Sequence, residues 1–188
     1  GMGEPLDNLD EVLKSLEILT ADWGYGWNPK KITVSTIGII PAMKRFLDES
    51  TAHLAVSLHN PFDDERSALM PVNKTYPVKE IINELKKYPF DRSRRVSFEY
   101  IVFGGINDSR RHVNELARLL NGINCRINLI RFHTNPGSEL NGTDEESLMA
   151  FKEALIAKGI VTTIRASRGQ DIDAACGLLS TEELLKNQ

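Results

Sequence analysis

Short apolar, β-branched runs recur along the chain, and between them lie segments in which apolar residues have helical spacing. The runs are found at Ile32–Ser35, Leu54–Leu58, Val96–Phe103, Ile127–Phe132 and Ile160–Ile164. Runs of this kind are typical of strands. The pattern therefore predicts five strands that alternate with helices.

The segments with helical spacing are Leu6–Trp23, Pro41–Glu49, Val78–Lys87, Ser109–Leu120 and Glu145–Lys158. Asp108 and Asp144 precede the last two segments as start signals, and Gly122 and Gly159 follow them as stop signals. Alternating strands and helices indicate parallel strands joined by right-handed crossovers. This predicts an α/β fold, either an open doubly wound sheet or part of a β/α barrel.

Composition is that of an ordinary soluble globular protein. The 188 residues, 41% hydrophobic and 26% charged, are enough for one well-packed domain. No run of about 18 apolar residues occurs, and the amino terminus lacks the basic and apolar pattern of a signal peptide. We therefore expect a cytoplasmic protein with no membrane partner.

Cysteine content and charge limit the partners further. Cys125 and Cys176 are too few for the scaffold of a secreted protein, so both are expected to be thiols. The net charge of −3 gives no overall attraction to nucleic acid. Any RNA binding must come from a local patch or from a part of the protein outside this chain.

The chain opens on Gly1–Pro5, a turn typical of a strand end, with no strand before it. An α/β domain rarely begins there, because the helix that follows would lack its neighbour in the sheet. We therefore interpret residues 1–188 as the carboxyl-terminal part of a domain whose first strands are missing. Their loss would leave an exposed sheet edge, which tends to pair with another chain, so self-association is expected.

Cys176 lies among small residues, Ala174, Ala175 and Gly177, near the end of the chain. Little side-chain bulk would shield its sulfur from a large substrate. An approachable thiol is a candidate nucleophile. The other reading is a buried structural cysteine, since free cysteines are among the most buried residues.

Several strand ends taken together resemble those of the radical S-adenosylmethionine (SAM) methyltransferases of the RlmN/Cfr group, which modify an adenosine of large-subunit ribosomal RNA. The matching segments are Gly1–Pro5, Ile32–Gly38, Val56–His59, Met70–Lys74, Ile127–Ile130 and Arg168–Gly177. They follow one another in order along nearly the whole chain. The resemblance implies a partial (β/α) TIM-like barrel of the radical SAM type, truncated at its amino-terminal strands.

Ligands of such barrels bind at the carboxyl ends of the strands. The SAM-binding residues that the resemblance implies are Gly3, Glu4, Ser35, Ser57, Leu58, His59 and His133. Gly3 and Glu4 would bind the methionine amino group, and the serines and the segment around His59 would bind the carboxylate, ribose or adenine. His133 stands where many relatives carry an Asn, and an imidazole can still make one hydrogen bond.

For the full-length protein, the resemblance implies a reaction with two molecules of SAM. One methylates Cys176, giving S-methylcysteine. The second is cleaved by an electron from a four-iron, four-sulfur (4Fe-4S) cluster, and the resulting radical activates that methyl group. The carbon is then transferred to carbon 2 of an adenosine in 23S rRNA and in tRNA. A donor such as flavodoxin would supply the electron.

The cluster motif of the family, C-x-x-x-C-x-x-C, does not occur in this chain, because Cys125 and Cys176 are far apart. The chain by itself is therefore expected to hold no cluster and to be inactive. Cys125 is interpreted as a core residue. His59 and His133 find no third and fourth ligand at a spacing that would indicate zinc.

Two other functions stay open from the sequence. The first is methylation of carbon 8 of the same adenosine, as in the Cfr-type relatives that confer antibiotic resistance. The second is a non-catalytic α/β module that binds SAM or a nucleotide and never held a cluster. The RNA site, the electron donor and the oligomeric state are left open.

Overall fold

The computed structural model describes residues 3–132 and 140–165, which include one five-stranded sheet. The strands are β1 (Thr33–Thr36), β2 (His53–Ser57), β3 (Val96–Val102), β4 (Cys125–Arg131) and β5 (Val161–Ile164). They lie in the order β1-β2-β3-β4-β5, and every neighbouring pair is parallel. The predicted strands are confirmed, nearly at their predicted positions.

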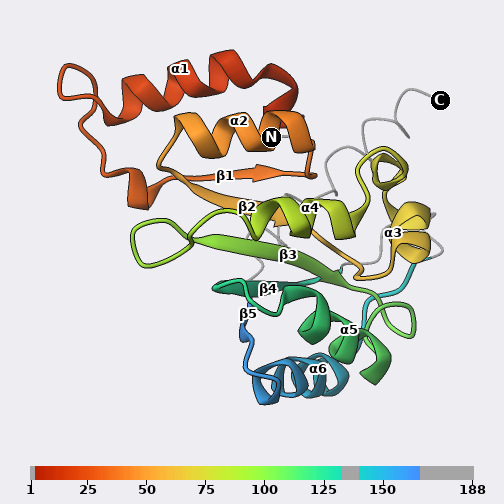
Figure 1. The fold of residues 1–188 in the computed structure, drawn as a ribbon. Helices are drawn as coiled ribbons and strands as arrows, with labels where there is room; N and C mark the ends of the chain where they lie inside the picture. The colour runs from red at the N-terminus through yellow and green to blue at the C-terminus, as the bar shows by residue number, and fades with distance from the viewer. Residues whose placement is uncertain (1–2, 133–139, 166–188) are drawn as a thin grey trace, which may run out of the picture.

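The connections between strands are helical. They contain α2 (Ile40–Glu49), α3 (Asp63–Leu69), α4 (Val78–Leu85), α5 (Arg110–Leu120) and α6 (Glu145–Ala157), with the 3-10 helix η3 (Pro71–Lys74). Before β1 the chain forms α1 (Leu9–Thr20) and the 3-10 helices η1 (Pro5–Asn8) and η2 (Pro29–Lys31). Contacts link α1 to α2, α2 to α4, α4 to α5 and α5 to α6. Figure 1 shows these helices along one face of the curved sheet.

This arrangement distinguishes the two α/β folds that the sequence left open. A doubly wound sheet carries helices on both faces, whereas successive β/α units of a barrel place every helix on the outside. The strand order follows the chain order, as it does in a barrel. The expected partial barrel is therefore confirmed, and within the described residues β1 and β5 are its open edges. Self-association through these edges stays a prediction.

The core lies between the sheet and the helices. In β3 the side chains alternate, so that Val96, Phe98, Tyr100 and Val102 are buried while the residues between them are only half-buried. Burying an apolar side chain of this size stabilises the fold by about 1.5–3 kcal/mol. The half-buried residues face away from the helices, toward the interior of the partial barrel.

Two helix predictions differ from the structure. The first helix was predicted over Leu6–Trp23, but in the structure α1 is shorter, because η1 precedes it and a glycine-containing loop follows Thr20. Helix α3 was not predicted, since a helix as short as Asp63–Leu69 shows little apolar periodicity.

The predicted helix signals near α5 and α6 are confirmed in part. Asp144 caps α6 by accepting a hydrogen bond from a backbone N–H of the first turn. Asp108 does not cap α5, whose N-cap position is Ser109, and the carboxylate of Asp108 accepts a loop N–H instead. Gly122 and Gly159 have positive φ angles of 87° and 83°, as expected of residues that end a helix. No helix in the described part of the chain is long and apolar enough to cross a membrane.

Candidate functional site

Glu4 ties the start of the chain to the carboxyl end of β1. Its Oε1 accepts hydrogen bonds from Leu6 N at 3.0 Å and from Thr36 Oγ1 at 2.7 Å, and its Oε2 accepts one from Ile37 N at 2.7 Å. A carboxylate has about four acceptor positions, so one is left for an ammonium group. The space beside Gly3 is open, because a Cβ there would meet nothing within 4 Å.

Ser35 and Ser57 lie on the sheet face that points away from the helices. Ser35 is the exposed third residue of β1, and Ser57 is the last residue of β2, paired with Glu99 of β3. Neither hydroxyl makes a hydrogen bond to another described residue, so both are free to contact a ligand. Ser35 therefore stands one residue before the strand end at which it was expected.

The same face continues as a polar row across β3, β4 and β5. Asn128 Nδ2 donates to Glu99 Oε1 at 2.7 Å, and Thr163 Oγ1 donates to Asn128 Oδ1 at 2.7 Å. Glu99 Oε2 is buried without a hydrogen bond among the described residues, 4.0 Å from Arg165 Nη1. The row forms part of a groove of about 390 Å³ inside the partial barrel. The interior is thus built for a polar ligand.

Arg66 holds together the carboxyl ends of β1 and β2. It is fully buried, and its guanidinium donates to the carbonyl oxygens of Ile37 at 3.0 Å, Ser57 at 2.8 Å and Leu58 at 2.9 Å. Burial lowers the pKa of Arg66 to about 10, although the charge of Asp63 opposes this shift, so the group stays charged at neutral pH. The buried cation thus fixes the backbone from which the site residues extend.

Asn73 of η3 completes this buried network. Its Oδ1 accepts from Arg66 Nη1 at 2.7 Å and from Val78 N at 2.9 Å, while its Nδ2 donates to Asp63 O and Ser67 Oγ, both at 2.9 Å. Asn73 is 2% exposed. Because every polar atom of its amide has a partner, it locks the guanidinium of Arg66 in one orientation.

His59 follows β2 with an unusual backbone conformation. Its φ of 56° lies in the left-handed region, which non-glycine residues rarely adopt and which is enriched at functional sites. Asn107 stabilises this turn, since its Nδ2 donates to the carbonyl oxygens of His59 and Ile101, both at 2.7 Å. Asn107 is itself fully buried.

The imidazole of His59 has a defined tautomer. Its Nδ1 accepts a hydrogen bond from Ile101 N at 3.1 Å, and a backbone N–H can only donate. Burial, together with the nearby charge of Arg66, lowers the pKa of His59 to about 4. The ring is therefore neutral at physiological pH and carries its proton on Nε2. This N–H makes no hydrogen bond to another described residue and can donate to a ligand oxygen or ring nitrogen.

This pKa gives a testable pH dependence of stability. Histidine in an unfolded chain has a pKa of about 6.5, so protonation favours the unfolded state whenever the folded pKa is lower. The free energy of unfolding should therefore be highest above pH 6.5 and fall as the pH decreases toward 4. Urea denaturation between pH 5 and 7 should show a smaller fall in His59→Asn than in the unmodified protein.

His53 provides the comparison for that measurement. Burial, followed by the charges of Arg95 and Arg126, also lowers the pKa of His53. His53→Asn should therefore also reduce the fall in the free energy of unfolding at low pH, by the contribution of His53. Carboxylates contribute mainly at lower pH. An unchanged pH profile in His59→Asn would contradict the assignment of a neutral, buried imidazole.

A charged cluster next to the site joins α3 to α5. Glu65 accepts from Asn60 Nδ2 at 2.9 Å, lies 2.8 Å from His112 Nε2 and pairs with Arg111. Partial burial would raise the pKa of Glu65, but the hydrogen bonds from Arg111, His112 and Asn60 outweigh it and lower the pKa to about 2. Asn60 N donates to Leu58 O at 2.7 Å, so this cluster also supports the loop that carries His59.

Leu58 differs from the other predicted residues of its segment. Its side chain is fully buried in the core, its N–H donates to Glu99 O at 2.9 Å, and its carbonyl oxygen accepts from Arg66. A contact of this segment with SAM therefore has to come from the flanking Ser57 and His59. His133 and Cys176 lie outside the described residues, and their roles stay predictions.

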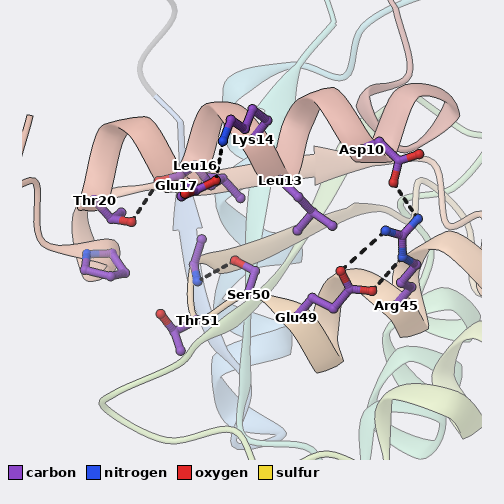
Figure 2. Close-up of a pocket in the computed structure, with 12 residues that line it drawn as sticks. Asp10, Leu13, Lys14, Leu16, Glu17, Thr20, Arg45, Glu49, Ser50 and Thr51 are labelled. Atoms are coloured by element: carbon purple, nitrogen blue, oxygen red, sulfur yellow. Dashed lines mark hydrogen bonds and ion pairs between the residues drawn. The ribbon is translucent and has the colours of Figure 1, made fainter. Parts of the chain in front are cut away.

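A groove of about 530 Å³ elsewhere on the molecule is not a candidate active site. It lies between α1 and α2, and Figure 2 shows its charged side chains turned toward one another. Arg45 bridges Asp10 at 2.7 Å and Glu49 at 2.5 Å, and Lys14 pairs with Glu17 at 2.8 Å. With these charges paired, the groove offers little to a ligand.

The described residues contain no group of three or more His, Cys, Asp or Glu side chains placed to hold a metal ion. A 4Fe-4S cluster would therefore need ligands from another part of the protein. The donors that do fit a ligand are the free hydroxyls of Ser35 and Ser57 and the Nε2–H of His59. These donors suit oxygen or nitrogen acceptors of a polar ligand, and the vacant acceptor position of Glu4 suits an ammonium group.

Sequence reasoning missed the residues that position these groups, namely Arg66, Asn73 and Asn107. Asn73 belongs to a segment that was noticed for its resemblance but given no role. Arg66 had no signal in the sequence, because its main partners are backbone carbonyls. Asn107 stands just after β3 in a loop of ordinary turn composition, where an amide is a common residue.

Comparisons with known proteins agree on a family. No protein-family model matches the chain. It is 56% identical over 190 residues to a protein of Bacteroides fragilis named a probable dual-specificity RNA methyltransferase RlmN, covering 100% of this chain and 55% of that protein. A protein of the same name from Parabacteroides distasonis is 60% identical over 181 residues, covering 96% and 53%. The chain spans about half the length of these curated relatives.

Two solved structures share the fold. A radical SAM methyltransferase from Sphaerobacter thermophilus superposes with a TM-score of 0.89 and 42% identity, covering 95% of this chain and 52% of that one. A domain of a pyruvate-formate lyase-activating enzyme from Bacteroides vulgatus has a TM-score of 0.65 at 16% identity, covering 88% and 96%, which shows the fold alone. The names of these relatives do not favour a non-catalytic module or the carbon-8 reaction. The chain therefore belongs to the RlmN family of radical SAM methyltransferases.

Proposed function

We propose that this chain is part of a longer protein that methylates carbon 2 of an adenosine in 23S rRNA and in tRNA. The proposal is supported by relatives that are named dual-specificity RNA methyltransferases. The structural observation that supports it is the set of polar groups at the carboxyl edge of the sheet that have no partner among the described residues, on a backbone held by Arg66 and Asn107. Such an edge is where barrels of this kind bind their ligands.

The described residues would hold SAM without rearrangement of their hydrogen bonds. Glu4 would accept from its ammonium group, and Ser35, Ser57 and His59 would donate to its oxygen or nitrogen acceptors. When bound, SAM supplies the methyl group and, on cleavage, a radical. The neutral His59 imidazole adds no positive charge near the SAM sulfonium, which favours its binding.

A 4Fe-4S cluster would be held by cysteines of the longer protein outside the described residues. Cys176 would receive the methyl group, and RNA would reach it across the carboxyl edge of the sheet. An electron donor such as flavodoxin and a cytoplasmic location complete the proposal. The adenosine must be unstacked to expose its ring carbon, as in other enzymes that act on a base.

The direct test uses the full-length protein, purified without oxygen and given SAM, a reductant and a fragment of 23S rRNA. We expect 2-methyladenosine, identified by mass spectrometry of the digested nucleosides. A second reaction with tRNA tests the dual specificity. Formation of 8-methyladenosine would assign the carbon-8 reaction instead, and the absence of any methylated base would contradict the proposal.

His59→Asn should raise the SAM concentration that gives half the maximal rate by about 2- to 12-fold, which corresponds to one hydrogen bond of about 0.5–1.5 kcal/mol. Asparagine tolerates the left-handed backbone of this position, so the loop should keep its shape. His53→Asn, at the opposite end of β2, is the matched control. A half-saturating concentration that rose equally in both variants would indicate a loss of stability and no contact of His59 with SAM.

A further inference from the structure

Three large aromatic side chains project into solvent from the loop between α1 and η2, which we call the aromatic loop (residues 23–27). Trp23, Tyr25 and Trp27 are 67%, 68% and 51% exposed. The rings of Tyr25 and Trp27 lie 5.9 Å apart at 57° to one another. A single exposed aromatic residue is common, but a cluster of this kind usually marks a contact surface.

The backbone holds the aromatic loop in one shape. Tyr25 N donates to Ile18 O at 3.0 Å, and Trp27 N donates to Leu19 O at 2.8 Å, so the loop folds back on the last turn of α1. A Cβ at Gly24 would lie 2.0 Å from Ile18 O, which only glycine avoids. The rings are therefore presented by a fixed scaffold, and little conformational entropy is lost when they bind a partner.

Positively charged side chains follow the aromatic loop along the chain and recur before β3. The exposed cations near the amino-terminal ends of the first three strands are Lys30, Lys31, Arg92 and Arg95. A groove of about 380 Å³ joins the segment 28–30 to the segment 88–94 at this edge. Of the acids here, the Asp91 carboxylate is occupied by the N–H and hydroxyl of Ser93 and by Arg94 N, and Asp22 is exposed.

This combination favours a nucleic acid over a protein as the partner. Lysine is depleted at the centres of protein interfaces, although tryptophan and tyrosine are enriched there. Exposed aromatic rings beside lysine and arginine are the arrangement with which proteins bind single-stranded nucleic acid, because bases stack on the rings while the cations contact phosphates. A local basic patch of this kind also overcomes the net charge of −3.

We propose that Trp23, Tyr25 and Trp27, with Lys30 and Lys31, form a second RNA-binding surface on which unpaired bases stack. The aromatic loop lies at the end of β1 opposite to its arrowhead (Figure 1), and thus away from the carboxyl edge where methylation is proposed. The surface would hold a distant part of the same RNA. It rests on the proposed function in that RNA is the substrate.

Fluorescence provides a test on the 188-residue chain itself, because its two tryptophans are Trp23 and Trp27. Addition of a single-stranded RNA of about 10 nucleotides should quench their emission as bases stack on the indole rings. Inorganic polyphosphate carries the same charge without bases and should leave the emission nearly unchanged. Equal quenching by polyphosphate, or no quenching by RNA, would overturn the proposal.

Variants of the full-length protein separate stacking from charge. Trp27→Ala should weaken the binding of labelled RNA about 5- to 150-fold, and Lys30→Gln should reduce the slope of log affinity against log salt by about 0.7. Ile156→Ala, which trims a 42% exposed side chain on α6, is the control and should change neither. Unchanged RNA affinity in Trp27→Ala would overturn the proposal.

The outcomes also distinguish this surface from the methylation site. Loop variants with normal RNA affinity and normal methylation would contradict the second RNA-binding surface but not the proposed function. Absence of methylation by the unmodified protein would contradict the proposed function. If acrylamide quenches the emission of the full-length protein to the same extent with and without Trp23→Phe and Trp27→Phe, another protein segment covers the aromatic loop, and the proposal is wrong.

Discussion

Replacing Cys176 with serine is expected to abolish RNA methylation by the full-length protein and leave its fold intact. A thiol is partly ionised near neutral pH, whereas a serine hydroxyl is almost fully protonated and is a far poorer nucleophile. Loss of a nucleophile typically lowers the rate by more than about a thousandfold. The rate of methyl incorporation, measured by nucleoside mass spectrometry, checks this expectation.

Cys125 is the matched control, because it is the other cysteine of the chain. It begins β4, and burial raises the pKa of its thiol to about 11. The thiol is therefore not ionised at neutral pH and is not a competent nucleophile. Cys125→Ser should keep most of the activity and lose about 1–3 kcal/mol of stability, because a hydroxyl replaces a sulfur at a packed position.

The site of methylation on the protein gives a second readout. Mass spectrometry of the full-length protein isolated from cells should find an added methyl group on the peptide that contains Cys176. A methyl group on Cys125, or RNA methylation by Cys176→Ser at the normal rate, would contradict the assignment of Cys176 as the methyl acceptor.

The strands could be predicted because each buries a short apolar run, and this requirement is visible in the sequence. Phe98 and Tyr100 alternate with Ser97 and Glu99, and the structure places the two pairs on opposite faces of β3. The exact ends were less predictable, as the early end of α1 at Thr20 shows. There the chain leaves the helix because Tyr25 and Trp27 bond back to the carbonyls of its last turn.

The positions of several candidate residues at strand ends could be predicted from the sequence, whereas the residues that support them could not; the roles of the candidates stay predictions. Glu4, Ser57 and His59 stand out because they follow strand ends in recognisable segments. The left-handed backbone of His59 and the tautomer of its ring depend on Asn107 and Ile101, which are distant in sequence. Such contacts are made by tertiary packing, and a single sequence carries no direct record of them.

Arg66→Leu is expected to destabilise the protein more than any surface substitution. It would remove the Arg66 donor from the carbonyl oxygens of Ile37 and Ser57, leave Leu58 O with only its bond from Asn60 N, and take one partner from the side-chain oxygen of Asn73. Breaking a buried charged network by removing one partner costs about 3–5 kcal/mol. Urea denaturation at pH 7 should show this fall in the free energy of unfolding.

Two further variants make the test decisive. Arg66→Lys keeps the charge but lacks the planar guanidinium that reaches several carbonyls at once. Its free energy of unfolding should therefore lie between that of Arg66→Leu and that of the unmodified protein. Arg118→Leu removes an arginine whose side chain is 65% exposed and pairs with Glu115, and its loss should stay below about 1 kcal/mol. Arg66 fixes the carbonyl groups of Ser57 and Leu58, and these residues lie at or next to the candidate SAM contacts. Arg66→Lys should therefore also raise the half-saturating concentration of SAM. If Arg66→Leu were no less stable than Arg118→Leu, the buried guanidinium would not be what joins β1 and β2 at the carboxyl edge of the sheet.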